Sequence, residues 1–163
     1  MLAMGIDPGN AICGYGFVEL KGNSLHGAGH GVIRTSPDMG RGQRLQYIYE
    51  KLHSLIRERC PDIVGVEKLF FNRNVTTAMT VSEARGVILL AVEMNGVSLI
   101  EPTPLQVKQA VVGYGQATKE QVIYMTQRLL CLDKKATPDD AADALAIAIC
   151  SVHSWSAEKI WRG

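Results

Sequence analysis

The sequence lacks the features that mark membrane-spanning, secreted and strongly cationic proteins. Its apolar runs, such as Val87–Val92, are far shorter than the ~20 residues that a transmembrane helix needs. The four cysteines show no C-x-x-C spacing, and no cationic leader precedes an apolar segment, so free thiols in a reducing cytosol (a cytoplasmic protein) are expected. Lysine and arginine number 17 against 16 acidic residues, which gives a net charge of +1 and no basic surplus.

What the chain does contain suits one globular domain. At ~150 residues per domain, 163 residues make about one, and 47% hydrophobic with 20% charged residues can form a sizeable core. The sequence shows no internal repeat and no second core. We therefore expect a single domain over residues 1–155 and a short C-terminal tail over residues 156–163.

The spacing of apolar residues predicts an α/β fold. Alternation and turn residues predict an antiparallel opening meander, and the short apolar run 62–67 between two helical segments is typical of a buried parallel strand. The order β-β-β-α-β-α-β-α-α-α describes one five-stranded mixed sheet with helices on both faces. The predicted strands are 2–6, 15–20, 25–35, 62–67 and 97–100, and the predicted helices are 43–59, 76–93, 105–112, 119–131 and 139–153.

Several acidic residues stand in apolar surroundings, where a carboxylate is costly unless it meets a cation or hydrogen-bond donors. Asp7 ends the first strand, Glu67 ends the fourth, and Asp143 lies within an alanine-rich helical run. In open α/β sheets the ligand crevice lies at the carboxyl ends of the strands, where Asp7 and Glu67 fall. Asp140, three residues before Asp143, shares a helix face with it. Oxygen ligands without nearby His or Cys suit a hard ion such as Mg²⁺ or Mn²⁺.

The two strand acids also have structural interpretations. Asp7 can form an Asx turn before the Pro-Gly pair that follows it, and Glu67 can pair with a cation such as Lys68 or Arg85. Each acid taken singly is ambiguous. Their combination at strand ends and within an apolar helix favours a functional site.

The start of the last predicted helix has a structural interpretation of its own. Thr137 is a suitable N-cap, Pro138 suits the first helical position, and acidic residues in the first turn favour the helix dipole. A stabilising role at the helix start accounts well for Asp139, whereas the role of Asp140 stays open. Asp143 is too far into the helix for capping, which favours a functional role.

Five short motifs occur in order along nearly the whole chain. They are Gly5-Ile6-Asp7-Pro8-Gly9, Gly14-Tyr15-Gly16, Val66-Glu67 with Phe70, Gln106-Val107-Lys108-Gln109, and Asp140-Ala141-Ala142-Asp143-Ala144-Leu145-Ala146. In this combination they resemble the RuvC family of Holliday-junction resolvases. The resemblance implies a ribonuclease H-like fold, a homodimer, and cleavage of four-way DNA junctions with a divalent metal.

The resemblance also implies roles for particular residues. The family's four catalytic, metal-binding acids fall on Asp7, Glu67, Asp140 and Asp143, with the adjacent Asp139 as a second choice for the third acid. We expect two Mg²⁺ ions per site, bridged by Asp7, with Mn²⁺ as the alternative ion. Such an endodeoxyribonuclease would make paired symmetrical nicks, leaving 5′-phosphate and 3′-hydroxyl ends, in recombination and repair. A branch-migration helicase is the partner expected from the family.

Two lysines beside these motifs are candidates for DNA binding. Lys108 and Lys119 flank the glycine-containing loop 113–117. A cation such as Lys119 at the start of a helix opposes the helix dipole unless an anion visits. Lys108 lies on an amphipathic helix, where a solvated charge is the structural alternative, and the family match favours a phosphate contact.

Two adjacent aromatic residues stand out in a chain with 6% aromatic residues. Phe70 matches the family's position and is expected to stack on an unpaired base at the junction, with Arg73 as a further DNA contact. Packing in the core or in a dimer interface is the alternative for either ring, and the role of Phe71 is open.

A four-way junction has two-fold symmetry, so paired cuts require two sites related by a dyad. This requirement favours a homodimer. Helix 76–93, with the apolar residues Met79, Val87 and Leu90, is the candidate seam, and packing of that face on the sheet is the alternative.

Other functions compete with this interpretation. The motif around Asp7 is similar to the phosphate turn of sugar kinases and actin-like ATPases, but those proteins need two such domains. A related ribonuclease H-like nuclease acting on RNA or other branched intermediates would carry similar acids. A non-catalytic junction-binding protein would not need all four acids. No Walker lysine motif is present, and His26 and His30 are expected to be structural.

Overall fold

The computed structural model describes residues 1–69 and 75–162. Helices and strands in this part of the chain follow the predicted order. The strands are β1 (Leu2–Asp7), β2 (Ile12–Lys21), β3 (Ser24–Arg34), β4 (Ile63–Val66) and β5 (Ser98–Ile100). The helices are α1 (Arg41–Arg59), α2 (Val75–Met94), α3 (Pro104–Val112), α4 (Lys119–Leu129) and α5 (Asp139–Arg162).

The strands form one sheet in the order β3-β2-β1-β4-β5. β1 pairs antiparallel with β2, and β2 with β3, which confirms the predicted meander. β4 pairs parallel with β1, and β5 with β4, which confirms that the run 62–67 forms a parallel strand. Because β1, β4 and β5 run the same way, their carboxyl ends lie at one edge of the sheet.

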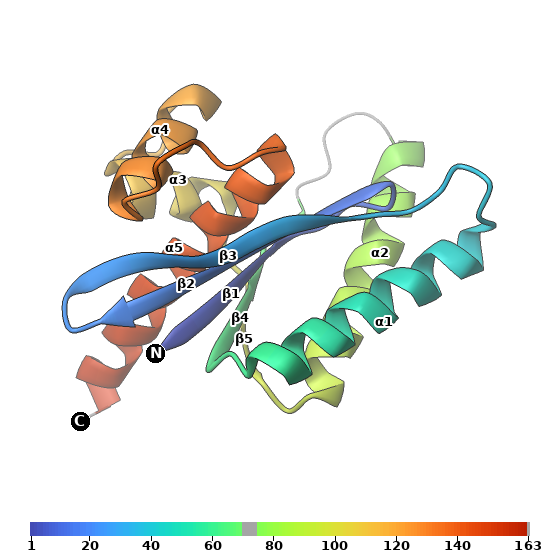
Figure 1. Ribbon diagram of the computed structural model, residues 1–163, viewed down its shortest axis with the longest axis horizontal. Helices are drawn as coiled ribbons and strands as arrows, with labels where there is room; N and C mark the ends of the chain where they lie inside the picture. Colours follow the sequence, from blue (N-terminus) through green and yellow to red (C-terminus); the bar gives the residue numbers. More distant parts are fainter. Residues whose placement is uncertain (70–74, 163) are drawn as a thin grey trace.

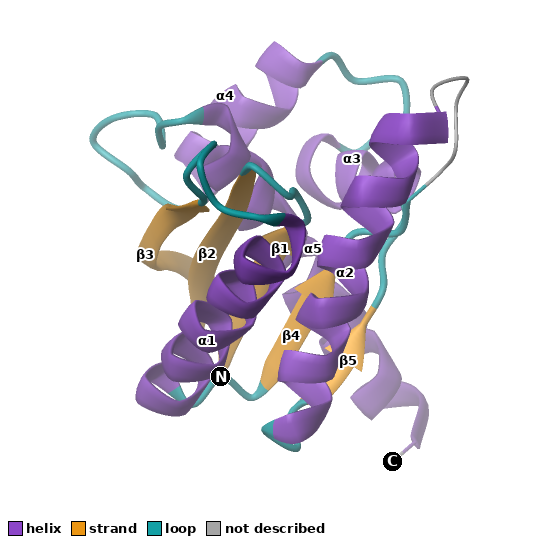
Figure 2. Ribbon diagram, turned by 90° about the vertical axis from the view of Figure 1, so that its right-hand side faces the viewer, coloured by secondary structure: helices purple, strands orange, loops and turns teal. Residues whose placement is uncertain are grey.

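Two helical layers enclose the sheet (Figure 1). α1 and α2 cover one face, whereas α5 crosses the other face and has α3 and α4 packed on it (Figure 2). Side chains alternate along β1, so Met4 and Ile6 join the core beneath α1 and α2, while Ala3 joins the core beneath α5. The same alternation turns Asp7 toward the α5 face. The predicted mixed sheet with helices on both faces is confirmed.

Glycines on the α5 face let that helix approach the sheet closely. Gly5 of β1 is paired with Gly16 of β2 and with Gly65 of β4, so the three form a row across adjacent strands. A Cβ atom at Gly5 would overlap the main-chain carbonyl oxygen of Ala144, and one at Gly16 would press against Leu145. This glycine row is the groove in which α5 lies, and it fixes the height of α5 above the sheet.

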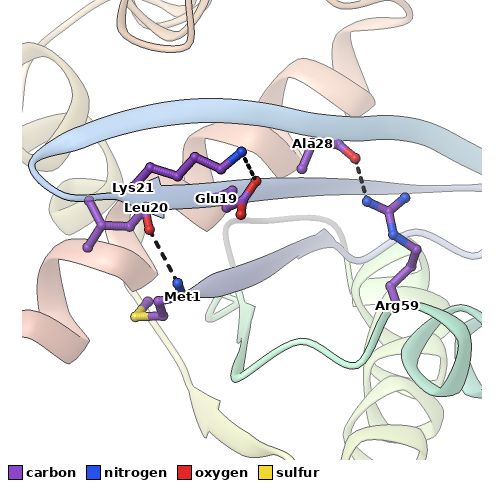
Figure 3. Close-up of polar contacts among 6 residues, drawn as sticks. All are labelled: Met1, Glu19, Leu20, Lys21, Ala28 and Arg59. Carbon is purple, nitrogen blue, oxygen red and sulfur yellow. Dashed lines mark hydrogen bonds and ion pairs between the residues drawn. The ribbon is translucent and has the colours of Figure 1, made fainter.

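A β-bulge ties the β2–β3 hairpin to α1. The register shifts between Phe17 and Val18, which leaves Ala28 of β3 as the extra residue. Arg59, the last residue of α1, donates a hydrogen bond to the carbonyl oxygen of Ala28 at 2.5 Å (Figure 3). Its guanidinium also lies over the Phe17 ring, 4.5 Å from the centroid. Arg59 therefore holds the long edge hairpin against the α1 layer.

α5 begins at Asp139, as in the predicted range 139–153, whereas the capping pattern places Pro138 at the first helical position. Pro138 is therefore the residue directly before α5 and not its first residue. The Pro138 carbonyl accepts a hydrogen bond from the Ala141 N–H at 3.0 Å. Ala136, in the connector before α5, is buried in the core beside this helix.

The end of α5 differs from the prediction. The helix continues to Arg162 instead of ending at His153, so the tail expected over residues 156–163 is helical as far as residue 162. The sequence from 154 to 162 contains neither Gly nor Pro, and nothing in it stops a helix. None of the helices in residues 1–69 and 75–162, α5 included, combines the length and apolar character that crossing a bilayer requires.

The glycine row predicts a large difference between two Gly→Ala substitutions. Gly5→Ala should lower the free energy of unfolding by about 1–3 kcal/mol, because the new methyl group must push α5 away from β1. Gly42→Ala in α1 is the matched control, since no atom lies within 4 Å of a Cβ there, and its stability should be unchanged or slightly higher. Urea unfolding measures both; equal stabilities would contradict the proposed role of the row.

Candidate active site

The pairing of β1 with β4 brings Asp7 and Glu67 together. Ile6 pairs with Val66, so the next residues, Asp7 and Glu67, leave adjacent strands side by side. Asp7 is the last residue of β1, whereas Glu67 directly follows β4, which ends one residue earlier than predicted. Both acids therefore lie at the carboxyl edge of the sheet, where open α/β sheets bind ligands.

α5 brings two further acids to the same edge. Gly14 of β2 pairs with Asp7, and a Cβ atom at Gly14 would overlap the main chain of Asp140. Asp140 therefore lies over the strand beside Asp7, and Asp143 follows about one helical turn later. The close approach that the glycines permit thus sets the position of both acids.

Asp139 lies in a different environment from Asp140. It is exposed, with its carboxylate 3.9 Å from Lys119 Nζ and 3.7 Å from Lys135 Nζ. Asp140 is half-buried, and its charge acts on Asp7. This difference supports Asp140 as the third acid of the site and leaves Asp139 in the first turn, where the helix dipole favours an acid.

A cleft of about 200 Å³ opens at this edge of the sheet. Its charged lining consists of Asp7, Glu67, Asp143, Lys108 and Lys119. The remaining walls are apolar and comprise Pro104, Val107, Val122 and Ala146. A pocket in which a few charged groups converge between apolar walls is the usual form of a binding or catalytic site.

Burial and mutual repulsion raise the pKa values of the carboxyl groups in the cleft. Burial, followed by the charges of Asp143, Glu67 and Asp140, raises the pKa of Asp7 to about 7. Burial and the charge of Asp143 raise the pKa of Glu67 to about 7, and burial is the main cause that raises the pKa of Asp143. The four carboxylates are therefore close enough for their charges to repel one another.

Two lysines offset part of this negative charge. Lys119 Nζ lies 2.9 Å from Oδ2 of Asp143, and this contact raises the pKa of Lys119. The ion pair explains a cation in the first turn of α4, a position that the helix dipole alone disfavours. The charge of Lys108, from α3, opposes the rise in the pKa of Glu67 that burial causes.

Arg85 contacts Glu67 through the main chain. Its Nε donates a hydrogen bond to the Glu67 carbonyl oxygen at 3.2 Å, and its guanidinium forms an ion pair with Glu101. The carboxylate of Glu101, and not that of Glu67, thus pairs with the positive charge of Arg85. Sequence reasoning did not single out Glu101, although an acid directly after a predicted parallel strand marks the same edge of the sheet.

The predicted DNA contacts Phe70 and Arg73, and the neighbouring Phe71, lie outside the described residues. Their roles stay predictions.

The donor set fits a hard divalent cation by its chemistry. No three His, Cys, Asp or Glu side chains in the described part of the chain already form a group that could hold a metal ion. All four predicted ligands are nevertheless carboxylates, and the repulsion that adds to burial in raising the pKa of Asp7 is what a divalent cation would relieve.

The sheet order, with acids supplied by β1, β4 and the crossing helix α5, places the protein in the ribonuclease H-like class of nucleases. The family model described as crossover junction endodeoxyribonuclease RuvC matches residues 3–151. The chain therefore belongs to the RuvC family, whose nucleases are metal-dependent. The resemblance that the five sequence motifs indicated is confirmed.

Individual relatives agree with the family match. Crossover junction endodeoxyribonuclease RuvC of Heliobacterium modesticaldum is 54% identical over 154 residues, which cover 94% of this chain and 95% of that protein. The structure of Thermus thermophilus RuvC matches with a TM-score of 0.87 and 34% identity, over 98% of this chain and 96% of that one. T. thermophilus RuvC in complex with a Holliday junction substrate matches with a TM-score of 0.90 and 35% identity, over 95% and 94%. These matches confirm the predicted fold class and enzyme class.

The raised pKa values predict how stability depends on pH. Since the pKa values of Asp7 and Glu67 rise from 3.8 and 4.5 to about 7, the folded protein binds more protons than the unfolded chain between these values. Its stability therefore falls as pH rises from about 4 to about 7 and levels off above. Asp7→Asn removes the most buried of these charges, so its Tm at pH 8 should exceed that of the parent by at least about 3 °C.

Thermal unfolding in a metal chelator from pH 4 to pH 8 measures this difference. The gap between variant and parent should shrink toward pH 4, where Asp7 is protonated in the folded state. A gap that stays constant over the whole range would show that the charge of Asp7 is not its cause.

Proposed function

We propose that the protein is a structure-selective endonuclease that resolves four-way DNA junctions by hydrolysing phosphodiester bonds. The observation that carries the proposal is the cleft in which mutually repelling carboxylates lie beside two lysines. Carboxylates attract hard divalent cations, and lysines attract phosphates. The complex of T. thermophilus RuvC with a Holliday junction substrate supports the choice of substrate. Membership of the RuvC family leaves no support for the kinase-like alternative.

Asp7, Glu67, Asp140 and Asp143 are the residues that would hold the cations, with Mg²⁺ as the proposed ion, two per site, and Mn²⁺ as its substitute. Bound there, such ions would supply an activated water and stabilise the departing 3′ oxygen, so that cleavage leaves a 5′ phosphate. Asp7 is the most central ligand, because the charges of the other three acids all contribute to its raised pKa. That position supports Asp7 as a residue that would hold the cations together with the other three acids.

Lys119 and Lys108 are the proposed phosphate contacts. The Lys119 side chain is 52% exposed, so DNA can reach its ammonium group while that group touches Asp143. Lys108 approaches from α3 and lines the same cleft. Both cations thus lie in the same cleft as the carboxylates, where a bound phosphate would meet them. Arg73 and Phe70 are proposed to extend this contact to further phosphates and to an unpaired base.

We also propose that the active form is a homodimer through α2. Met79, Leu90 and Met94 of this helix are 58%, 52% and 63% exposed, whereas Ala84 and Ile88 on its other side are fully buried. Packing on the sheet therefore uses one side of α2 and leaves large apolar side chains uncovered on the other. A second copy of the chain would cover them, and a dyad would give the two sites that paired cuts require.

The cellular setting follows from the same proposal. Resolution of junctions serves recombination and repair, and a branch-migration helicase is the proposed partner. The cysteines of the described residues are free thiols, with Cys13 and Cys150 buried, which supports a reducing compartment such as the cytosol.

The direct test is incubation with a labelled four-way junction, and with a linear duplex of the same sequence, in Mg²⁺ at several salt concentrations. Nicks at symmetrical positions, confined to the junction, are expected. Equal cutting of the linear duplex would contradict the proposal. Preferential cutting of an RNA strand would favour the related nuclease that acts on RNA.

The same assay tests the carboxylates through matched variants. Asp143→Asn should reduce the cleavage rate at least about 100-fold, because metal ligands supply several kcal/mol of transition-state stabilisation. Junction binding measured in Ca²⁺ should stay within twofold of the parent. Glu58→Gln, which removes an exposed acid of α1, should change neither quantity. Cleavage by Asp143→Asn at the parent rate would remove Asp143 from the site.

The proposed dimer predicts the effect of one added charge on α2. Leu90→Glu should convert the dimer to a monomer, because it would bury like charges against each other across the dyad. Tyr124→Glu, at a 56% exposed apolar position on α4, is the control and should leave the dimer intact. Light scattering after gel filtration measures both, and a parent protein that elutes as a monomer at tens of micromolar would contradict the proposal.

A further inference from the structure

The peptide group between Glu67 and Lys68 is held at both of its polar atoms. Its carbonyl oxygen accepts the hydrogen bond from Arg85 Nε at 3.2 Å, and its N–H donates to the carbonyl oxygen of Pro102 at 2.9 Å. The β4–β5 ladder ends before this peptide, so the two bonds extend the contact between these segments toward the cleft. The plane of the peptide that follows Glu67 is thereby fixed.

Arg85 is held in turn by Glu101. The ion pair joins α2 to the residue that follows β5, and the Arg85 side chain is only 18% exposed. A guanidinium presents several donors in one rigid plane, so it can bond a carbonyl oxygen and a carboxylate together. A lysine at this position would offer a single point charge and could not fix both partners in one geometry.

From this arrangement we infer that Arg85 is a positioning residue for Glu67, and that Glu101 holds Arg85 in place. Fixing the plane of the peptide after Glu67 restricts the ψ angle of Glu67. It therefore also restricts the direction in which the Glu67 side chain leaves the main chain. The conformational entropy that the Glu67 carboxylate would otherwise lose on binding a cation is therefore already lost when the protein folds. A displacement of about 1 Å in a catalytic constellation can cost ~100-fold in rate, so such restraint matters.

The inference deepens the proposed function and rests on it, because it takes Glu67 as a ligand of the catalytic cations. The competing interpretation is that Arg85 only fastens α2 to the sheet. If Arg85 only fastens α2, replacing it lowers the Tm and leaves the behaviour of Glu67 in folded molecules unchanged. A positioning role changes the behaviour of Glu67 in molecules that are fully folded.

The first measurement needs neither metal nor DNA. Hydrogen exchange at the Lys68 amide should accelerate at least about tenfold in Arg85→Met, because the peptide loses the bond at its carbonyl end and is free to turn. Arg41→Met is the matched control: it removes an Arg–Glu pair between α1 and α2, in which Arg41 Nε lies 2.7 Å from Glu83. Exchange at Lys68 in this control should stay within twofold of the parent.

The second measurement is Mn²⁺ binding by calorimetry together with single-turnover junction cleavage, both well below the Tm of each variant. Arg85→Met should bind Mn²⁺ at least fivefold more weakly and cut at least tenfold more slowly, with junction affinity in Ca²⁺ within twofold of the parent. Higher Mg²⁺ should recover part of the rate. Arg85→Lys and Glu101→Gln should lie between Arg85→Met and the parent, whereas Arg41→Met should match the parent.

Unchanged Lys68 exchange and unchanged Mn²⁺ affinity in Arg85→Met would overturn the positioning role, as would a rate loss that appears only near its Tm. The parent protein reports on the proposed function separately. A parent that binds Mn²⁺ but leaves junctions uncut would contradict the nuclease assignment, and the exchange and binding data would still decide the role of Arg85. A parent that binds no Mn²⁺ would overturn both.

Discussion

The close packing of α5 on the sheet is the constraint on which the rest of the site depends. α5 can carry two acids to the end of β1 only because Gly5, Gly16 and Gly65 leave no side chains under the helix where it crosses the strands. A helix lying on ordinary side chains would stand farther from the sheet. Asp140 and Asp143 would then be lifted from Asp7, and the charge repulsion that characterises the cleft would be lost.

The cleft works against the stability of the fold that contains it. Carboxylates are gathered between apolar walls, where burial and like charges oppose their ionisation, and Lys119 and Lys108 offset only part of that cost. Proteins commonly break the rules of stable packing at the place where they act. Here the surrounding structure is rigid enough to hold the acids together, since α5 is embedded between the sheet and the helices α3 and α4.

Much of this arrangement could be predicted from local sequence patterns. Asp7 and Glu67 each follow an apolar strand, and Asp143 interrupts an apolar helix, so each carries a visible cost that points to function. The glycine row could not be predicted in the same way. Gly5, Gly16 and Gly65 are far apart in sequence, and only the pairing register places them side by side.

The support of Glu67 by Arg85 was beyond sequence reasoning for the same physical reason. The contacts of Arg85 join a helix to the ends of two strands, and their geometry depends on how those elements lie in space. Local signals therefore identified the acids, and long-range packing determined how they are supported.

The uncovered side of α2 gives the proposed dimer a property that neither protomer has alone. Packed helices lie about 8–10 Å apart, and each α2 is fastened to the sheet whose edge carries the acids. Two such helices packed against each other would set the distance between the two cleavage centres. The protein dimer would then determine the separation of the two cuts. The arms of a branched DNA would have to open until its two scissile phosphates match that separation.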